Sequence, residues 1–145
     1  MTRLIGLDHG SRRIGVAVGD TETGMAFARP ALRMRSSAAA EEAVKRLADE
    51  EGATIVVVGL PYLADGSEGT QAAAVRGFGE RLRRIGLEVV YEDERLSSWA
   101  AGEGLAEGGR RPPRESGEVD SAAARLILQQ YLDARPSPGL PEETT

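Results

Sequence analysis

The 145-residue chain contains no cysteine and a single histidine, His9. The absence of cysteine excludes disulfide bonds, thiolate zinc sites and cysteine nucleophiles. No apolar run reaches the length of a membrane span or of the hydrophobic core of a signal peptide. We therefore expect a cytoplasmic protein with no membrane partner.

Lysine is nearly absent as well, since Lys45 is the one lysine among 18 basic residues. Arginine differs from lysine because its planar guanidinium can form paired hydrogen bonds with a phosphate. The formal net charge of −5 argues weakly against a polyanionic partner, but the arginines are clustered. The clusters are Arg12 with Arg13, and Arg110 with Arg111 and Arg114. Each is either a phosphate-binding patch or a solvated loop, and the charge pattern leaves both readings open.

Length and composition predict one domain over residues 1–135, because 41% hydrophobic residues suffice to bury a continuous core. Residues 136–145 contain three prolines and no periodicity, so we expect a disordered tail there. Hydrophobic periodicity predicts strands over 4–7, 14–18, 25–34, 54–60 and 87–91, and helices over 38–51, 68–85, 97–107 and 118–134. Pro30 in the third strand predicts an edge position or a bulge. This order fits an α/β fold with a single mixed sheet flanked by helices.

Three acidic residues stand where this fold would bring them together. Asp8 ends the first strand, Glu94 follows the last strand, and Asp120 lies at the start of the last helix. Open α/β sheets form their sites beyond the carboxyl ends of strands. Carboxylates placed there can hold Mg²⁺ or Mn²⁺, and such a site indicates phosphodiester hydrolysis.

Two of the acids also have purely structural explanations. Asp8 can cap the following turn by accepting hydrogen bonds from the amides of Gly10 and Ser11. Asp120 can stabilise a helix dipole, although the alanines at 122–124 give its helix a small-residue face that would bring the helix start close to the sheet. His9 follows Asp8 on the strand, so we expect its side chain to point to the opposite face and to be structural.

Five segments together resemble the YqgF family, also called RuvX. They are GLDHG at 6–10, RIGVAVGD at 13–20, VGLP at 58–61 with DGS at 65–67, DERLSS at 93–98, and VDSAA at 119–123 with ILQQYL at 127–132. The resemblance implies an RNase H-like fold and a nuclease that trims the 5′ end of precursor 16S ribosomal RNA or resolves Holliday junctions. It places the active-site acids on Asp8, on the Asp93–Glu94 pair and on Asp120. Departures from the family pattern at His9, Ser97-Ser98, Gly102 and Gly104 remove no carboxylate.

The mechanism expected from this resemblance is metal-ion hydrolysis with Mg²⁺ or Mn²⁺. Asp8 would bridge two cations, Glu94 and Asp120 would hold one each, and water would be the nucleophile. Glu94 is preferred over Asp93 because its side chain is longer. Gly59 and Gly66 would allow the strand to approach closely. The nucleic-acid phosphates would be bound by Arg12, Arg13, Arg95, Arg110, Arg111 and Arg114.

Two other functions stay open at this point. The first is an actin-like or sugar-kinase-type nucleotide-binding domain, because Asp8 with Gly10 and Ser11 before a hairpin also resembles the phosphate loop of those folds. Such proteins enclose ATP between two domains, and this chain has the length of one. The second is a nucleic-acid-binding module without activity. The sequence does not distinguish RNA from branched DNA, nor a monomer from a homodimer.

Overall fold

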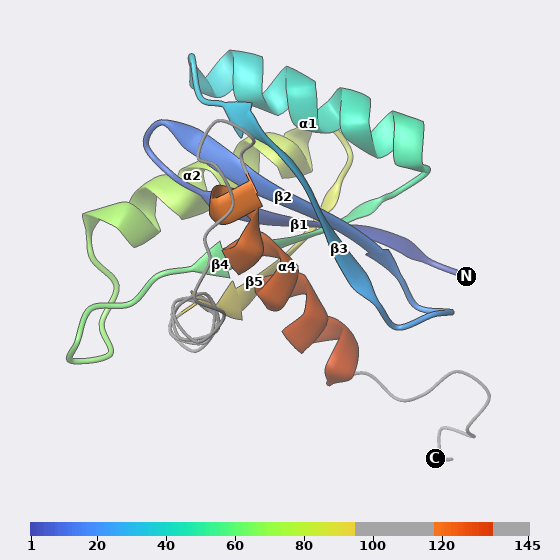
Figure 1. The fold of residues 1–145 in the computed structure, drawn as a ribbon. Coiled ribbons are helices and arrows are strands. Elements are labelled where there is room, and N and C mark those ends of the chain that lie inside the picture. Colours follow the sequence, from blue (N-terminus) through green and yellow to red (C-terminus); the bar gives the residue numbers. More distant parts are fainter. Residues whose placement is uncertain (95–117, 135–145) are drawn as a thin grey trace.

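The computed structural model describes residues 1–94 and 118–134 of the protein (Figure 1). Five strands form one sheet in the order β3-β2-β1-β4-β5. They are β1 (Arg3–His9), β2 (Arg13–Asp20), β3 (Ala26–Arg33), β4 (Ile55–Leu60) and β5 (Glu88–Asp93). Because β1 pairs antiparallel with β2 and parallel with β4, the predicted mixed sheet is confirmed.

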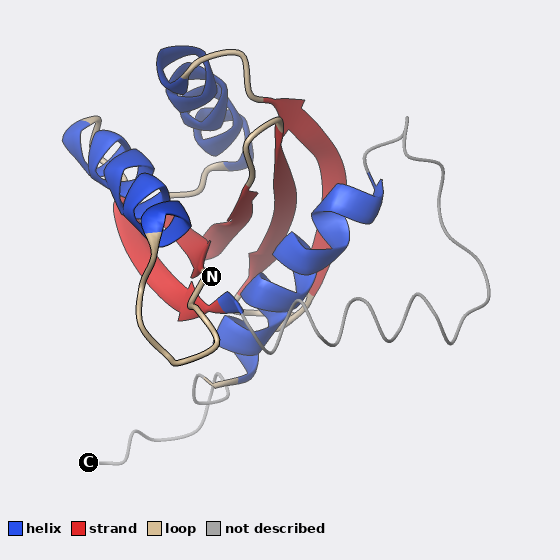
Figure 2. Ribbon diagram, turned by 90° about the vertical axis from the view of Figure 1, so that its left-hand side faces the viewer, coloured by secondary structure: helices blue, strands red, loops and turns tan. Residues whose placement is uncertain are grey.

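Helices lie on both faces of the sheet (Figure 2). Helices α1 (Ser37–Glu51) and α2 (Thr70–Arg84) cover one face, and α4 (Glu118–Asp133) covers the other. Successive residues of a strand point to opposite faces, so each strand contributes to two cores. On β1, Leu7 packs in the core beneath α1 and α2, whereas Leu4 packs in the core beneath α4.

Strand β3 lies at an edge of the sheet and contains a register shift. Val16 of β2 pairs with Arg29, and Ile14 pairs with Leu32, so Pro30 and the next residue together face one residue of β2. Proline has no N–H to donate to a neighbouring strand, which explains both the edge position and the bulge. Both predictions made from Pro30 are confirmed.

Strand β5 extends further than its residue pattern predicts. Its pairing with β4 continues to Leu60 opposite Asp93, because β4 itself runs on to Leu60. The predicted helix at 97–107 and the predicted tail at 136–145 lie outside the described residues. Within 1–94 and 118–134, none of the helices combines the length and the apolar character needed to cross a lipid bilayer.

Candidate active site

Asp8 and His9 end β1 with their side chains on opposite faces. The His9 ring packs against Phe78 of α2, with 5.0 Å between the ring centroids. Burial there lowers the pKa of His9 below its ordinary value, so the imidazole is neutral at neutral pH. Asp8 lies on the other face, toward Glu94. The prediction that His9 points away from Asp8 is confirmed.

Glu94 follows β5 and turns toward the face that α4 covers. Glu92, two residues earlier, accepts a hydrogen bond from Nε2 of Gln130 on α4 at 2.7 Å. On the neighbouring strand β4, Gly59 lies directly behind the Glu94 side chain. A Cβ placed on Gly59 would stand 2.9 Å from Oε1 of Glu94 and would also clash with Ile127. Glycine at this position therefore makes room for the carboxylate of Glu94.

Gly66, the second glycine expected to permit a close approach, has a different role. Its φ of +89° lies in the left-handed region, and a Cβ placed there would meet no atom within 4 Å. The residue forms the turn after β4, where Asp65 accepts hydrogen bonds from the backbone and side chain of Ser67. Backbone conformation, and not space, is the reason for glycine here.

The Asp8 and Glu94 carboxylates form a coupled pair. Burial raises the pKa of Glu94 to about 7, with further contributions from the negative charge of Asp8, a hydrogen bond to Asp8 and the charge of Asp93. Oε1 of Glu94 is buried and has no hydrogen-bond partner among the described residues. A buried carboxylate oxygen without a partner, beside a second carboxylate, is an unfavourable arrangement unless a proton or a cation lies between them.

Helix α4 is attached to the sheet by the buried hydroxyl of Ser121. Its Oγ accepts a hydrogen bond from the Val16 amide at 3.0 Å and donates one to the Arg29 carbonyl oxygen at 2.5 Å. Val16 and Arg29 are the paired residues beside the bulge in β3. The hydroxyl thus bridges two strands where their ladder is interrupted. Residue patterns did not reveal this role, because a serine in a helix carries no signal for a distant bulge.

The direction of α4 brings its first turn to the end of β1 that carries Asp8. Ser121 lies at the level of Val16, which pairs with Leu7. Near the other end of the helix, Leu132 lies beside Gly19, which pairs with Leu4. The helix therefore runs opposite to β1. The third predicted acid, Asp120, directly precedes Ser121 in α4, and its side chain lies outside the described part of the structure.

Close packing of α4 on β1 is made possible by Gly6. A Cβ placed on Gly6 would lie 2.7 Å from Cβ of Leu128 and 2.9 Å from the Ala124 carbonyl oxygen. Ala124 is fully buried, which agrees with the small-residue face expected after Asp120. Glycine on the strand and alanine on the helix together let the two backbones approach.

Of the predicted phosphate-binding arginines, two lie in the described part of the chain. Arg12 is exposed in the turn between β1 and β2, and Arg13 begins β2 opposite Arg33 of β3. The Gly10 amide, one of the two donors in the turn-capping explanation of Asp8, donates to the carbonyl oxygen of Arg13 at 3.0 Å. Arg95, Arg110, Arg111 and Arg114 lie outside the described residues.

A complete metal-binding cluster is not present among the side chains that the structure describes. Within that set, no three histidine, aspartate or glutamate residues are grouped closely enough to hold an ion. The described pair nonetheless suits a hard divalent cation. It consists of oxygen donors, and Glu94, whose Oε1 has no partner among the described residues, lies beside Asp8.

Comparison with known proteins identifies the family. The model of the family described as "RuvX: Holliday junction resolvase" matches residues 2–134. The chain belongs to this family. A relative from Synechococcus elongatus, named "Putative pre-16S rRNA nuclease", is 41% identical over 139 residues, which cover 92% of this chain and 91% of the relative. A relative of the same name from Moorella thermoacetica is 42% identical over 132 residues, covering 90% and 94% of the two chains.

Solved structures show the same fold at low sequence identity. The RuvC resolvase of Thermus thermophilus, solved in complex with a Holliday junction substrate, aligns with a TM-score of 0.59 at 15% identity and covers 92% of this chain and 98% of its own. The large terminase nuclease of the thermophilic phage G20c aligns with a TM-score of 0.54 at 15% identity, covering 90% and 81%. The RuvX family and the RNase H-like fold expected from the five sequence segments are both confirmed. The family match favours a nuclease over the kinase-type nucleotide-binding domain.

Proposed function

We propose that this RuvX-family protein is a divalent-metal-dependent nuclease whose catalytic carboxylates are Asp8, Glu94 and Asp120. The observation that carries the proposal is the coupled pair of Asp8 and Glu94, with the raised pKa of Glu94 and its buried oxygen without a partner. A protein does not gain stability by burying two neighbouring carboxylates, so a functional reason for the pair is favoured.

Each carboxylate would have a defined role in holding the metal. Asp8 and Glu94 would hold Mg²⁺ or Mn²⁺ through carboxylate oxygens, and Asp120 would add a third ligand from the first turn of α4. A bound divalent cation supplies Lewis-acid stabilisation of the scissile phosphate and lowers the pKa of a water molecule. Gly59 keeps the space behind Glu94 open, and Ser121 keeps the start of α4 against the sheet.

The proposed substrate is nucleic acid with a structured end or branch. The relatives' name supports hydrolysis in the 5′-end processing of precursor 16S ribosomal RNA. The family description and the RuvC complex support hydrolysis at Holliday junctions. Arg12 and Arg13, in the turn that follows Asp8, would bind phosphates near the point of cleavage, and Arg95, Arg110, Arg111 and Arg114 would extend that contact.

A cleavage assay tests the proposal. The purified protein is incubated with Mg²⁺, Mn²⁺ or EDTA and a panel of labelled substrates: an RNA carrying the 5′ precursor segment of 16S ribosomal RNA, single strands, and a four-way DNA junction. We expect metal-dependent cleavage of at least one structured substrate. Asp8→Asn should abolish it, whereas Asp49→Asn, which removes an exposed acid of α1, should not.

Absence of cleavage of every substrate with either metal, despite measurable binding, would favour the inactive nucleic-acid-binding module. Cleavage that persists in EDTA would argue against the carboxylate site.

A further inference from the structure

We propose that a groove on the α1 and α2 side of the sheet binds a phosphate group, with the backbone of the nucleic-acid substrate as its expected source. The groove has a volume of about 610 Å³ and lies between the β1–β2 turn, the start of α1 and one face of α2. It is separate from the Asp8–Glu94 pair, which lies on the α4 side. That the phosphate belongs to nucleic acid rests on the proposed function. That the groove prefers a phosphate rests on its own lining residues.

The lining of the groove carries positive charge and no carboxylate. Arg35, Arg81 and Arg84 contribute guanidinium groups, and neither an aspartate nor a glutamate is among the lining residues. Arg81 is held by Glu41, with 3.0 Å between Nε and Oε1. Arg35 and Arg84 are exposed and form no ion pair with any other residue in 1–94 or 118–134. Two uncompensated guanidinium groups facing one hollow suit a phosphate.

The start of α1 contributes a second favourable feature. Ser36 caps the helix by accepting a hydrogen bond from the Ala39 amide at 3.0 Å, and both Ser36 and Ser37 line the groove. The first turn of α1 contains no acidic residue. The positive end of the helix dipole therefore lies at the groove with no acidic residue in its own first turn.

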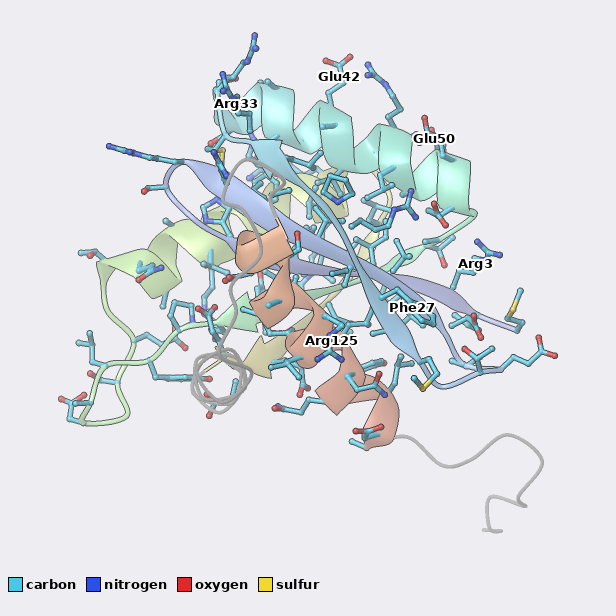
Figure 3. All side chains as sticks on the ribbon, viewed as in Figure 1. Arg3, Phe27, Arg33, Glu42, Glu50 and Arg125 are labelled. Carbon is cyan, nitrogen blue, oxygen red and sulfur yellow. The ribbon has the colours of Figure 1, made fainter. Side chains whose placement is uncertain are left out.

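Glu41 is the acidic residue of α1 that pairs with an arginine of the groove lining, Arg81. Glu42 and Glu50 project from the outer side of α1, away from the sheet (Figure 3). Arg33 projects at the end of the molecule where α1 begins, which adds positive charge beside the groove (Figure 3). The groove lining is thus positively charged, although the whole chain has a net charge of −5.

The floor of the groove is kept open by small residues of α2. Ala74 and Gly77 line it, and a Cβ placed on Gly77 would meet no atom within 4 Å. Neither packing nor backbone conformation requires glycine there, although glycine inside a helix lowers stability. Any long side chain at this position would stand in the groove.

The groove and the carboxylates meet at the same end of β1. His9 lines the groove, and Asp8, the preceding residue, faces the other side of the sheet. Their Cα atoms are about 3.8 Å apart, as in any trans peptide. A strand of nucleic acid bound at the carboxylates could therefore pass around the β1–β2 turn and place a phosphate in the groove.

Binding measurements on charge-matched variants test this proposal. Arg35→Ala with Arg84→Ala removes two charges from the groove. The control, Lys45→Ala with Arg46→Ala, removes two charges from the middle of α1, outside the lining. Affinity for labelled single-stranded RNA and for a four-way DNA junction is measured by fluorescence anisotropy in EDTA over a range of salt concentrations.

We expect the groove variant to bind both nucleic acids more weakly. Each lost phosphate contact should reduce the slope of log affinity against log salt by about 0.7 on single strands and about 0.9 on duplex DNA. The control should keep the wild-type slope. Gly77→Glu, which removes no existing contact, should weaken binding as the groove variant does. Equal losses in the groove variant and the control, or no loss in either, would overturn the proposal.

Two further measurements complete the test. The first distinguishes a free phosphate ligand from the nucleic-acid backbone, and the second distinguishes the groove proposal from the proposed nuclease activity. Titration with inorganic phosphate and with a mononucleotide, followed by NMR, detects a free phosphate ligand. Saturation that the groove variant loses, together with unchanged nucleic-acid affinity, would assign the groove to that ligand. Cleavage at saturating substrate is measured in parallel. If the groove variant binds nucleic acid more weakly but keeps the wild-type kcat, the result supports the phosphate-binding groove. If the wild-type protein binds nucleic acid through the groove but cleaves no substrate, the result refutes the proposed nuclease activity and leaves the groove supported.

Discussion

The Glu94 carboxylate lies beside the carboxylate of Asp8 on the side of the sheet that α4 covers. Two carboxylates in such contact require a proton or a cation between them. Burial raises the pKa of Glu94 to about 7, and the charge of Asp8 adds to this shift, so the protonated form of Glu94 supplies that proton in the metal-free protein.

Asp8→Asn should abolish metal-dependent cleavage and leave the fold intact. An amide is a poor ligand for a divalent cation, but its neutral side chain removes the repulsion with Glu94. We therefore expect cleavage below a few per cent of wild type, and a free energy of unfolding that is unchanged or higher in urea titrations. Substantial activity in the folded variant would remove Asp8 from the catalytic set.

Asp93 and Glu94 should differ in their contribution to metal binding. β5 runs through Asp93, so the two side chains point to opposite faces, and Glu94 is the one beside Asp8. Glu94→Gln should weaken Mn²⁺ binding more than Asp93→Asn, as measured by isothermal titration calorimetry. The opposite order would assign the second carboxylate to Asp93.

The metal-free protein should lose stability as the pH rises from about 5 to 8. The folded-state pKa of Glu94, about 7, is above the ordinary value of 4.5, so the folded state holds a proton that the unfolded state releases. This contribution is complete below the unfolded-state pKa and is lost as the pH rises through the folded-state pKa. The free energy of unfolding should fall by about 1–3 kcal/mol over this range.

Glu94→Gln serves as the control for this pH dependence, because it removes the titrating group. Its stability profile in EDTA should be flatter than that of wild type. Mg²⁺ should also flatten the wild-type profile by replacing the proton. A wild-type profile that is flat in EDTA would contradict the coupling between the two carboxylates.

Gly6→Ala should destabilise the protein, because the new methyl group would overlap Leu128 and the Ala124 carbonyl oxygen. Such overpacking typically costs about 1–3 kcal/mol. Gly77→Ala is the matched control, since its Cβ meets open space in a helix. It should raise stability by about 0.5–1 kcal/mol. Cleavage should fall with Gly6→Ala even at temperatures where the variant is folded, because α4 carries Asp120.

Replacing Arg110, Arg111 and Arg114 with alanine should weaken nucleic-acid binding without changing which substrate is cut. These residues lie outside the described part of the chain, between β5 and α4 in sequence. Each lost phosphate contact contributes about 0.7–0.9 to the salt slope, so the slope should flatten by up to about two to three units. Unchanged affinity and salt dependence would limit the phosphate contacts to Arg12, Arg13, Arg95 and the groove.

Among the described residues, the sequence predicted the strands and helices well because its periodicity was clear, and Pro30 indicated the bulge. The sequence predicted that Asp8 and Glu94 lie at the same edge of the sheet, because each follows the carboxyl end of a strand. It did not predict that their carboxylates interact. The raised pKa of Glu94 depends on the space left by Gly59 and on burial by α4, which are properties of three separate elements. Likewise, Arg35 and Arg84 belong to one groove only because α1 and α2 pack side by side, and no local pattern connects them.

The hydrogen bonds of the Ser121 hydroxyl limit which insertions α4 can accept without changing the position of residue 120. Consecutive residues of an α-helix are rotated by about 100° around its axis. The hydrogen bonds from Ser121 to Val16 and Arg29 therefore fix the rotation of α4 about its own axis. Inserting one residue between Asp120 and Ser121 would turn residue 120 by about 100° around the helix axis while leaving the core contacts that follow Ser121 unchanged. The bulge in β3 thus fixes the rotation of α4, the helix that contains Asp120.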